Sequence, residues 1–530
     1  LYPVYIGCVL LITIGLYELS KWMLMKLNAR YHWLLLIPIL LAVAGLATHQ
    51  IDRFPISVDE LLSMNNAGYY GGDASPIAVL DNLGTYSQQH VPLYFLILGM
   101  ASDVFGWTPP ALRMIGVWFG LLALTWVYRL GRDHFNSMAG IYSVLFVAGM
   151  TLYGFYYAHI RMYPLLVFGA AMFLWFYLRA TDARHTPSIG TLAGLSMSTL
   201  LFLSTHIFSI TLALSVGVYH LLIVSKSRRW WMVSGAVVVG GLPLVAWLPV
   251  LLRGFQHTST FSIVTQNALS SPEILLDMMI VYSNGVIPML LLWVGGALYI
   301  AWRHDSTVLR WLGLAGMTGV IILVIGGLVP IIPPDRLRYT LVLIIPLAIA
   351  FGGTLANHRV PVMVAGVIVV AWLATDVIMH RNYDMARYLG GRMNIYNMPH
   401  IDEQVPLIYD ATDGDTLLLS FSNHHDLTLA VRHGNTIQDF YYDSIQRAHY
   451  SIFIPQELLK ANDEIEAGVR DAIDGWSRVA WIESSEHAPP KRIRNAYLRA
   501  LQDFTVCQPI QLSADITLTY YVQSPTECDM

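Results

Sequence analysis

Two adjacent carboxylates, Asp59 and Glu60, follow an early apolar segment of this 530-residue chain. A carboxylate near a membrane segment is costly if it faces lipid, whereas in a polar cavity it suits general base catalysis or cation binding. The same polar stretch, residues 50–90, continues with Asp73, Asp81 and a QQHVPLY run that contains His90. The simpler alternative is the start of a solvated loop, where acidic residues are common.

The composition indicates which elements must position these residues. Hydrophobic residues make up 55% of the chain and charged residues 12%, against about 25% charged residues in a soluble globule. Apolar stretches alternate with short polar loops over residues 1–380, and residues 381–530 read as a water-soluble domain. The sequence therefore predicts a polytopic α-helical membrane domain followed by a small soluble domain. The net charge of −4 averages two unlike regions, and no nucleic-acid partner is expected.

Thirteen apolar segments approach the length of about 20 residues that a membrane helix needs, which predicts about 11–13 spans. The chain begins at Leu1, so further sequence is expected before it, and segment 3–19 is interpreted as a membrane helix rather than a signal peptide. The segments are 3–19, 33–49, 91–107, 111–128, 137–156, 164–180, 190–205, 207–224, 232–252, 284–302, 309–330, 339–356 and 360–379.

Basic residues in the short loops predict the orientation, because such loops are usually cytoplasmic. Basic residues near 21–30, 129–132, 179–184, 226–229, 303–310 and 359 place loops 50–90, 157–163, 253–283 and 331–338, the turn near residue 206, and residues 381–530 on the outer side. The alternation fails once, because segments 91–107 and 111–128 both lie between an outer and an inner loop. Either 91–107 does not cross, or one basic loop breaks the rule.

The soluble domain is predicted to alternate strands and helices. Strands are expected at 416–420, 477–482, 504–507 and 516–522, helices at 455–472 and 490–502, and a turn at 413–415, which together indicate a small α/β layer. No phosphate-binding loop is found, so the domain is interpreted as a lid or acceptor-binding domain. Cys507 and Cys528 fall in this outer domain, where a disulfide would persist; the alternative is two free thiols.

Several short motifs, in order, resemble the GT-C-type glycosyltransferases that use polyprenyl-phosphate sugars, such as protein mannosyltransferases and aminoarabinose transferases. The Asp59-Glu60 pair follows an early span, and HVPLY at residues 90–94 enters the next apolar segment. Further matches are LR at 112–113, YRLGR at 128–132, AHIRMY at 158–163, THIF at 205–208, and RY at 338–339 before Pro346. The family run "EARxY" is altered here, since His159-Ile160 replaces its Glu-Ala. The resemblance covers residues 50–380.

The resemblance implies a GT-C-like fold and a transferase that moves a sugar from a lipid phosphate to an acceptor at the outer face. The acceptor hydroxyl needs a base, and the anionic leaving group needs cationic or hydrogen-bonding partners. Asp59 is the expected base, with Glu60 beside it, and His90, Arg161 and Arg338 are expected to bind the donor phosphate. His90 stands where the aminoarabinose transferases carry a lysine.

Each assignment has a structural alternative. Arginines at span ends reach toward lipid headgroups, lone histidines are often satisfied polar groups, and Tyr163 and Tyr339 could belong to an interfacial aromatic belt. We expect Tyr163, His206 and Tyr339 to support the site. Glu60 could support Asp59 or bind a divalent cation, although the outer loops show no DxD triplet, and no metal site or cofactor is assigned.

Two other classes remain as alternatives to the enzyme. A transporter would show inverted repeats and ionisable residues at mid-membrane, and the sequence shows no repeat. A non-catalytic envelope assembly or binding protein would not need Asp59. Within the enzyme class the acceptor stays open between protein, lipid A and cell-envelope glycan, and the expected location is a prokaryotic cytoplasmic membrane.

Overall fold

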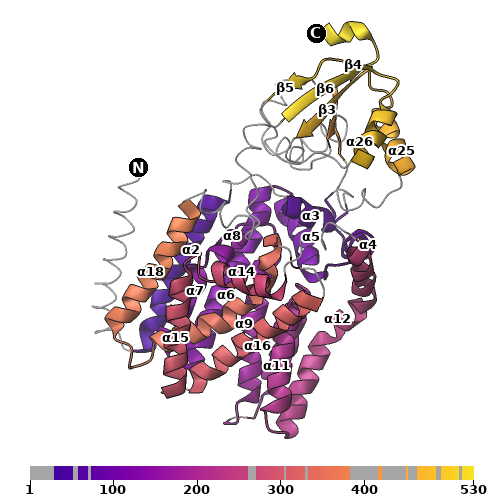
Figure 1. The fold of residues 1–530 in the computed structure, drawn as a ribbon. Helices are drawn as coiled ribbons and strands as arrows, with labels where there is room; N and C mark the ends of the chain where they lie inside the picture. The colour runs from indigo at the N-terminus through magenta and orange to yellow at the C-terminus, as the bar shows by residue number, and fades with distance from the viewer. Residues whose placement is uncertain are drawn as a thin grey trace. The chain divides into compact units, whose positions relative to one another are not determined.

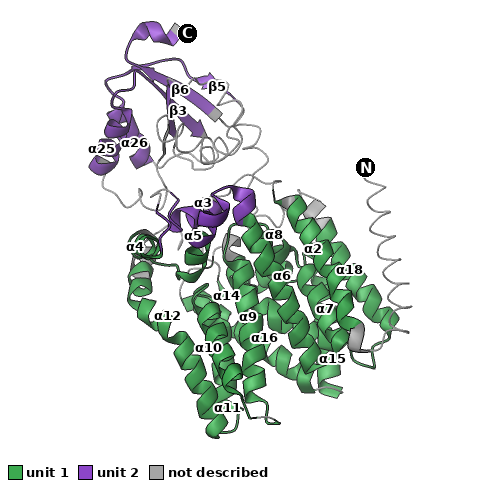
Figure 2. Ribbon diagram, turned by 180° about the vertical axis from the view of Figure 1, so that it is seen from behind, with its two compact units in different colours: residues 1–51, 76–98, 113–396 green, residues 52–75, 99–112, 397–530 purple. Residues whose placement is uncertain are grey.

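The computed structural model describes most of the predicted membrane domain (residues 1–380) and part of the predicted soluble domain (residues 381–530). It falls into two compact units, shown in green and purple in Figure 2: unit 1 contains residues 1–51, 76–98 and 113–396, and unit 2 contains residues 52–75, 99–112 and 397–530. Segment 3–19 and the turn at 413–415 lie outside the described residues. Those are 29–51, 58–69, 73–184, 186–260, 270–303, 306–328, 332, 334–381, 416–420, 449–451, 462–484, 491–512 and 516–529.

Unit 1 is a bundle of helices (Figure 1). Two helices, α5 (Leu93–Phe105) and α6 (Pro109–His134), begin in one unit and end in the other. The other helices of unit 1 are η1 (Ala29–Leu35), α2 (Leu36–Gln50), α4 (Pro76–Tyr86), α7 (Ser137–Ala148), α8 (Thr151–Tyr157), α9 (Tyr163–Thr181), α10 (Ile189–Leu203), α11 (Ser209–Leu222), α12 (Arg228–Thr260), α14 (Ser271–Val281), α15 (Ile287–Arg303), α16 (Ser306–Leu328), η2 (Pro334–Leu343), α17 (Ile344–Leu355) and α18 (Val362–Arg381).

The lengths of these helices agree with a membrane protein. Among the described residues, six helices are long and apolar enough to cross a bilayer, or seven if the bent pair α7–α8 forms one span, and five apolar helices are shorter. Local chemistry sets several starts: the Asn136 side chain accepts a hydrogen bond from the backbone N–H of Ala139 at α7, and Ser188 does the same for Thr191 at α10. The predicted polytopic helical fold is confirmed. The sequence did not predict α3 (Val58–Asn66), α4 or α14 within the outer loops.

Helix α5 bears on whether segment 91–107 crosses the membrane, a question that the sequence leaves open. At its start, the Leu93 N–H donates to the Ser204 carbonyl, 3.1 Å away, in the turn between α10 and α11. After its end, the Trp107 ring packs 5.2 Å from the ring of Tyr69, which follows α3. Both neighbouring segments were predicted on the outer side. With 13 residues, α5 spans about 20 Å, less than the hydrocarbon core of about 30 Å. The short length of α5 favours the alternative in which segment 91–107 does not cross, and under that alternative the charge alternation holds throughout.

Cysteine labelling tests this topology. In a Cys8→Ser background, Thr108→Cys should react with a membrane-impermeant maleimide on intact cells, as should Gln89→Cys on the exposed turn before α5. Arg359→Cys, in the predicted inner loop, should react only after permeabilisation. A Thr108→Cys protein that reacts only after permeabilisation would show that α5 crosses.

The soluble domain in unit 2 is built on one mixed sheet. Strand order is β2-β1-β3-β6-β4, with β5 also paired to β6; β1 runs parallel to β2 and β3, and β6 runs antiparallel to β3, β4 and β5. The predicted strands and helices are found: β1 and β6 have the predicted bounds and the others have shifted ends, whereas β2 and β5 were not predicted. The elements are β1 (Thr416–Ser420), β2 (His449–Ser451), α25 (Asn462–Ile473), β3 (Arg478–Ser484), α26 (Lys491–Ala500), β4 (Thr505–Val506), β5 (Ile510–Gln511), β6 (Ile516–Val522) and η4 (Pro525–Asp529).

The core of this domain is formed by one face of the sheet and one face of each helix, because side chains alternate along a strand and recur every three to four residues along a helix. Alternate residues of β1 and β3, such as Leu417, Leu419 and Trp481, point to one face of the sheet. They pack with Ile465 and Tyr497 from α25 and α26, and all five are buried. Charges lie outside this core: the Glu466 carboxylate accepts hydrogen bonds from two arginines, which lower its pKa.

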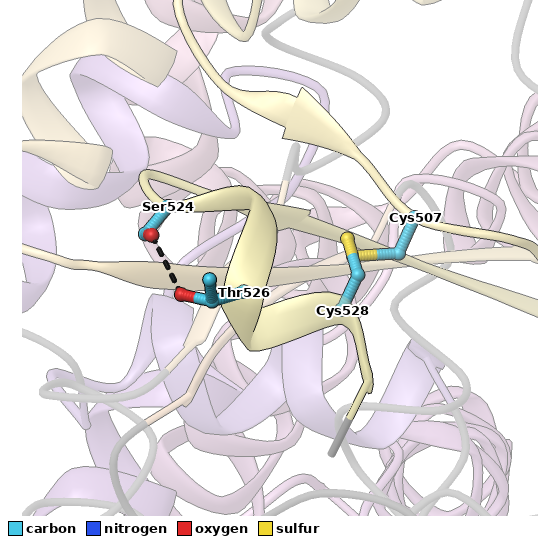
Figure 3. The surroundings of a disulfide bond; sticks show 4 residues. All are labelled: Cys507, Ser524, Thr526 and Cys528. Carbon is cyan, nitrogen blue, oxygen red and sulfur yellow. Dashed lines mark hydrogen bonds between the residues drawn. A yellow bond between two sulfur atoms is a disulfide. The ribbon is translucent and has the colours of Figure 1, made fainter.

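The structure joins Cys507 and Cys528 in a disulfide (Figure 3), with 5.3 Å between their Cα atoms. The bond connects the residue after β4 to η4, next to a hydrogen bond of 2.8 Å between the Ser524 and Thr526 hydroxyls. The predicted bridge is thus present.

Removing this bridge should destabilise the soluble domain. Cys528→Ser should lower the free energy of unfolding by about 2–4 kcal/mol, since the crosslink restricts the unfolded chain. Thermal unfolding with and without reductant measures the effect. Mass spectrometry of unreduced protein should find neither cysteine alkylated; alkylation of both would contradict the bridge.

Candidate functional site

Three turns of unit 1 bring most of the predicted site residues together. The turn between α8 and α9 carries Arg161 and ends at Tyr163, the turn between α10 and α11 carries His206, and η2 carries Arg338 and Tyr339. The ring of His206 lies 5.6 Å from that of Tyr163 and 5.1 Å from that of Tyr339. We call these five residues together with His90 the basic cluster.

The two arginines of the basic cluster are buried. Arg161 is 5% exposed and Arg338 is 3% exposed. Arg338 donates a long hydrogen bond of 3.5 Å to the Tyr156 hydroxyl, and each guanidinium lies near the ring of a tyrosine, Tyr163 or Tyr339, at about 6 Å. An exposed arginine that reaches toward headgroups would not be buried this deeply. The structure therefore excludes that alternative for both residues.

Electrostatics at His206 locate the positive charges of the cluster. Burial is the main cause that holds the pKa of His206 well below its ordinary value, and charges on His90, Arg161 and Arg338 lower it further. All three predicted phosphate-binding residues thus act on one imidazole from three different segments of the chain. A site that gathers positive charge in this way favours an anion.

His206 itself is placed as a neutral hydrogen-bond donor. Its Nδ1 accepts the backbone N–H of Phe208 at 3.1 Å, which leaves the proton of the neutral ring on Nε2. This arrangement also helps to start α11 at Ser209, one residue later. His206 can therefore donate to a bound oxygen without adding a charge.

The depressed pKa predicts a dependence of stability on pH. An unfolded histidine titrates near 6.5, while folded His206 stays neutral to lower pH. Below about pH 6.5 the unfolded state binds a proton that the folded state does not, so the stability contributed by His206 falls as the pH falls. The melting temperature of His206→Gln minus that of wild type should therefore increase as the pH is lowered from 7.5 to 5.5. A constant difference would contradict a depressed pKa.

His90 occupies the turn before α5. Its ring packs edge-on against Phe95 at 5.4 Å, and its carbonyl accepts a hydrogen bond of 2.9 Å from the Trp247 indole of α12. Close to this turn, the backbone of Gly254 lies so near Gln88 that a Cβ would meet it at 2.7 Å. Helix α12 therefore fixes the turn that carries His90.

A break between α7 and α8 positions the segment that bears Arg161. The two helices bend by 74° at residues 149–150. The Asn284 side chain stabilises the break by bonding backbone groups on both sides of residue 150. It donates to the Gly149 carbonyl at 2.7 Å and accepts from the Thr151 N–H at 3.1 Å. The Thr151 hydroxyl in turn donates to Asp376 of α18 at 2.8 Å. These bonds replace those that an unbroken helix would make.

Helix α6 supports the same segment. Gly116 lies against the carbonyls of Tyr157 and His159, so that a Cβ would meet them at 2.9 and 3.0 Å. His159, which replaces the glutamate of the family motif, bonds through Nδ1 to the Phe155 carbonyl at 2.6 Å. Sequence reasoning missed Tyr156, Asn284 and Gly116 as parts of the site. The positive φ of 49° at Asn284 is visible only in the structure.

The predicted base lies in the other unit. Asp59 and Glu60 form the first turn of α3, where carboxylates interact favourably with the helix dipole. Asp59 is partly exposed, whereas Glu60 is fully buried. The buried Glu60 is not a solvated loop residue, and the catalytic role of Asp59 stays a prediction. Within the described residues, no group of three His, Cys, Asp or Glu side chains could hold a metal ion.

Residues 89–252 match the family model described as dolichyl-phosphate-mannose-protein mannosyltransferase. This region contains His90, Arg161, Tyr163 and His206. No curated protein sequence matches the chain. Among solved structures, ArnT from Cupriavidus metallidurans in the apo state is similar, with a TM-score of 0.56 and 14% identity over 94% of this chain and 99% of that one.

This chain has the GT-C fold. The ArnT structure bound to undecaprenyl phosphate has a TM-score of 0.54 at 15% identity over 93% of this chain and 98% of that one. Arabinofuranosyltransferase AftD from Mycobacteria has a TM-score of 0.52 at 13% identity; the match covers 92% of this chain and 40% of AftD. The predicted resemblance to GT-C glycosyltransferases is confirmed, and their membrane-embedded fold agrees with the apolar helices of unit 1.

Proposed function

We propose that this protein is a membrane glycosyltransferase that moves a sugar from a polyprenyl-phosphate donor to an acceptor of the cell envelope. One observation carries the proposal: two buried arginines and two histidines from distant segments act together in the basic cluster. Guanidiniums attract an anion more strongly in a buried site than in water, because solvent screens their charge less there. The phosphate of a lipid donor is such an anion, and an ArnT structure of the same fold holds undecaprenyl phosphate.

The basic cluster and the Asp59-Glu60 pair have separate roles in the proposed reaction. The bond from the anomeric carbon to the phosphate oxygen breaks, and the acceptor oxygen forms the new bond to that carbon. Arg161 and Arg338 stabilise the charge that develops on the departing lipid phosphate. His206 donates a hydrogen bond from Nε2 to the phosphate. His90, in the turn before α5, binds the phosphate at the position where the aminoarabinose transferases carry a lysine. Asp59 is the base for the acceptor hydroxyl on the ground of the motif resemblance alone, with Glu60 beside it.

The orientation of the site belongs to the same proposal. The turns of the basic cluster are those that the basic loops place on the outer side, and residues 381–530 follow α18 to that side. The soluble domain then serves acceptor binding, in keeping with its disulfide. We propose a location in a prokaryotic cytoplasmic membrane.

The test is incubation of purified protein with a panel of radiolabelled polyprenyl-phosphate sugars and with protein, lipid A or glycan acceptor fractions. We expect label in one acceptor class from one donor, which would identify both. Label transfer that requires a nucleotide sugar would contradict the donor class. Binding without any transfer would favour a non-catalytic envelope protein.

A further inference from the structure

Arginines and tryptophans gather at the ends of α6 and α9 that lie away from the basic cluster. We call this group the arginine–tryptophan cluster: it consists of Trp126, Arg129, Arg132, Asp133, Trp175 and Arg179. Tyr163 of the basic cluster begins α9, and Arg179 lies 16 residues further along the same helix. At 1.5 Å per residue this separation is about 24 Å, close to the thickness of a bilayer core. The two clusters therefore face opposite membrane surfaces.

The aromatic rings hold the guanidiniums in place. Arg129 lies over the Trp175 ring at 3.9 Å and over the Trp126 ring at 5.1 Å, and Arg179 lies over Trp175 at 5.4 Å. The two indoles meet edge to face at 5.3 Å, and Trp175 Nε1 donates to the Asp133 carboxylate at 2.8 Å. Cation–π contacts with the two indoles restrict the motion of Arg129 and Arg179.

Positive charge exceeds negative charge in this cluster. The charges that act on Arg129 come from Asp133, Arg132 and Arg179. Asp133 bonds Arg132 at 2.7 Å and reaches Arg129 at 3.9 Å. Arg129 and Arg132 thus share the Asp133 carboxylate, and their side chains remain 45% and 43% exposed. The surplus charge is accessible to a further anion.

An apolar stripe leads along α6 to this charge. Trp118 and Leu122 are 46% and 44% exposed, and Trp126 follows four residues after Leu122. Residues four apart lie on one face of a helix, so the stripe runs from the middle of the helix to Arg129. A phosphate group with an acyl chain attached to it matches both parts. A soluble acidic partner would use the charge and leave the stripe uncovered.

We propose that the arginine–tryptophan cluster binds the phosphate headgroup of an anionic phospholipid in the leaflet opposite to the proposed active site. One acyl chain then lies along Trp118 and Leu122. The arginines donate charge-assisted hydrogen bonds to the phosphate, and Asp133 orients two of them. This site requires only the phospholipid and no sugar donor.

Native mass spectrometry of the full chain, purified with an equimolar mixture of phosphatidylglycerol and phosphatidylcholine, tests the site. Wild type should retain phosphatidylglycerol in preference, and Arg129→Gln/Arg132→Gln/Arg179→Gln should lower this preference by about tenfold or more. The matched control is Arg303→Gln, because Arg303 also lies over a tryptophan, Trp302 at 4.7 Å, at the end of α15. That control should keep the preference.

The lysine version of the triple variant separates charge from folding. It should keep at least part of the preference, since it retains three cations on the same helices. Equal retention of phosphatidylglycerol by wild type and a folded glutamine variant would overturn the proposal. Loss of the preference in the Arg303→Gln control, or capture of an acidic soluble protein without any lipid preference, would overturn it as well.

Discussion

Asp59→Asn should lower sugar transfer by about 10²–10⁴-fold, the usual contribution of a general base. The amide keeps the shape and hydrogen-bonding capacity of the side chain but cannot accept the proton of the acceptor hydroxyl. Donor binding should persist, because the proposed phosphate contacts belong to Arg161 and Arg338. The measurement is the initial rate of transfer at saturating donor, together with the dissociation constant of the donor.

Asp81→Asn provides the matched control for this variant. Asp81 is an exposed carboxylate on α4, in the same stretch of chain, and its loss should leave transfer within about twofold, as for most surface changes. A folded Asp59→Asn protein with near-normal transfer would show that Asp59 is not the base. The next candidates are then Glu60, buried beside it, and Asp73.

Arg338→Gln should weaken donor binding and lower turnover together. Hydrogen bonds to charged groups contribute about 1.5–3 kcal/mol, so we expect a loss of about 10- to 100-fold in affinity for the lipid phosphate. Turnover should fall as well, because the charge on the leaving phosphate grows as the bond breaks. Titration with unlabelled polyprenyl phosphate isolates the binding part of this effect.

Arg359→Gln is the control for the loss of an arginine. Arg359 is exposed in the loop between α17 and α18, so its replacement should change neither constant. Arg338→Lys should recover part of the affinity, since it restores the charge without the guanidinium fork. Unchanged affinity in a folded Arg338→Gln protein would separate the basic cluster from phosphate binding.

The fold could largely be predicted from the sequence because a membrane-spanning segment must be an apolar helix of nearly fixed length. Apolar stretches near 20 residues long gave the helices, and strand 516–522 was predicted with the bounds that the structure has. Short helices in the loops between spans are not recognised by this length criterion. Helix α14 has only 11 residues and lies in a loop that was predicted to be outer, so its apolar residues do not reach the length that identifies a span.

The site could be predicted only in part, for a geometric reason. Residue type and motif order singled out Arg161, His206 and Arg338, which the structure brings together. The contacts that fix them depend on distances between segments far apart in the chain. Asn284 bonds Gly149 across 135 positions, and Tyr156 bonds Arg338 across 182. No local pattern encodes such pairs, whereas short motifs encode the groups themselves.

Sugar transfer from a purified lipid donor tests the proposed activity most directly. Proteoliposomes that contain wild-type protein or Asp59→Asn are given a radiolabelled polyprenyl-phosphate sugar with envelope extract as the acceptor source. Label that leaves the organic-soluble donor is then measured over time. We predict steady release of label into the acceptor fraction with wild type and at least about 100-fold slower release with Asp59→Asn. Equal rates in the two samples, or no release from any lipid-linked sugar that wild type binds, would contradict the proposed function.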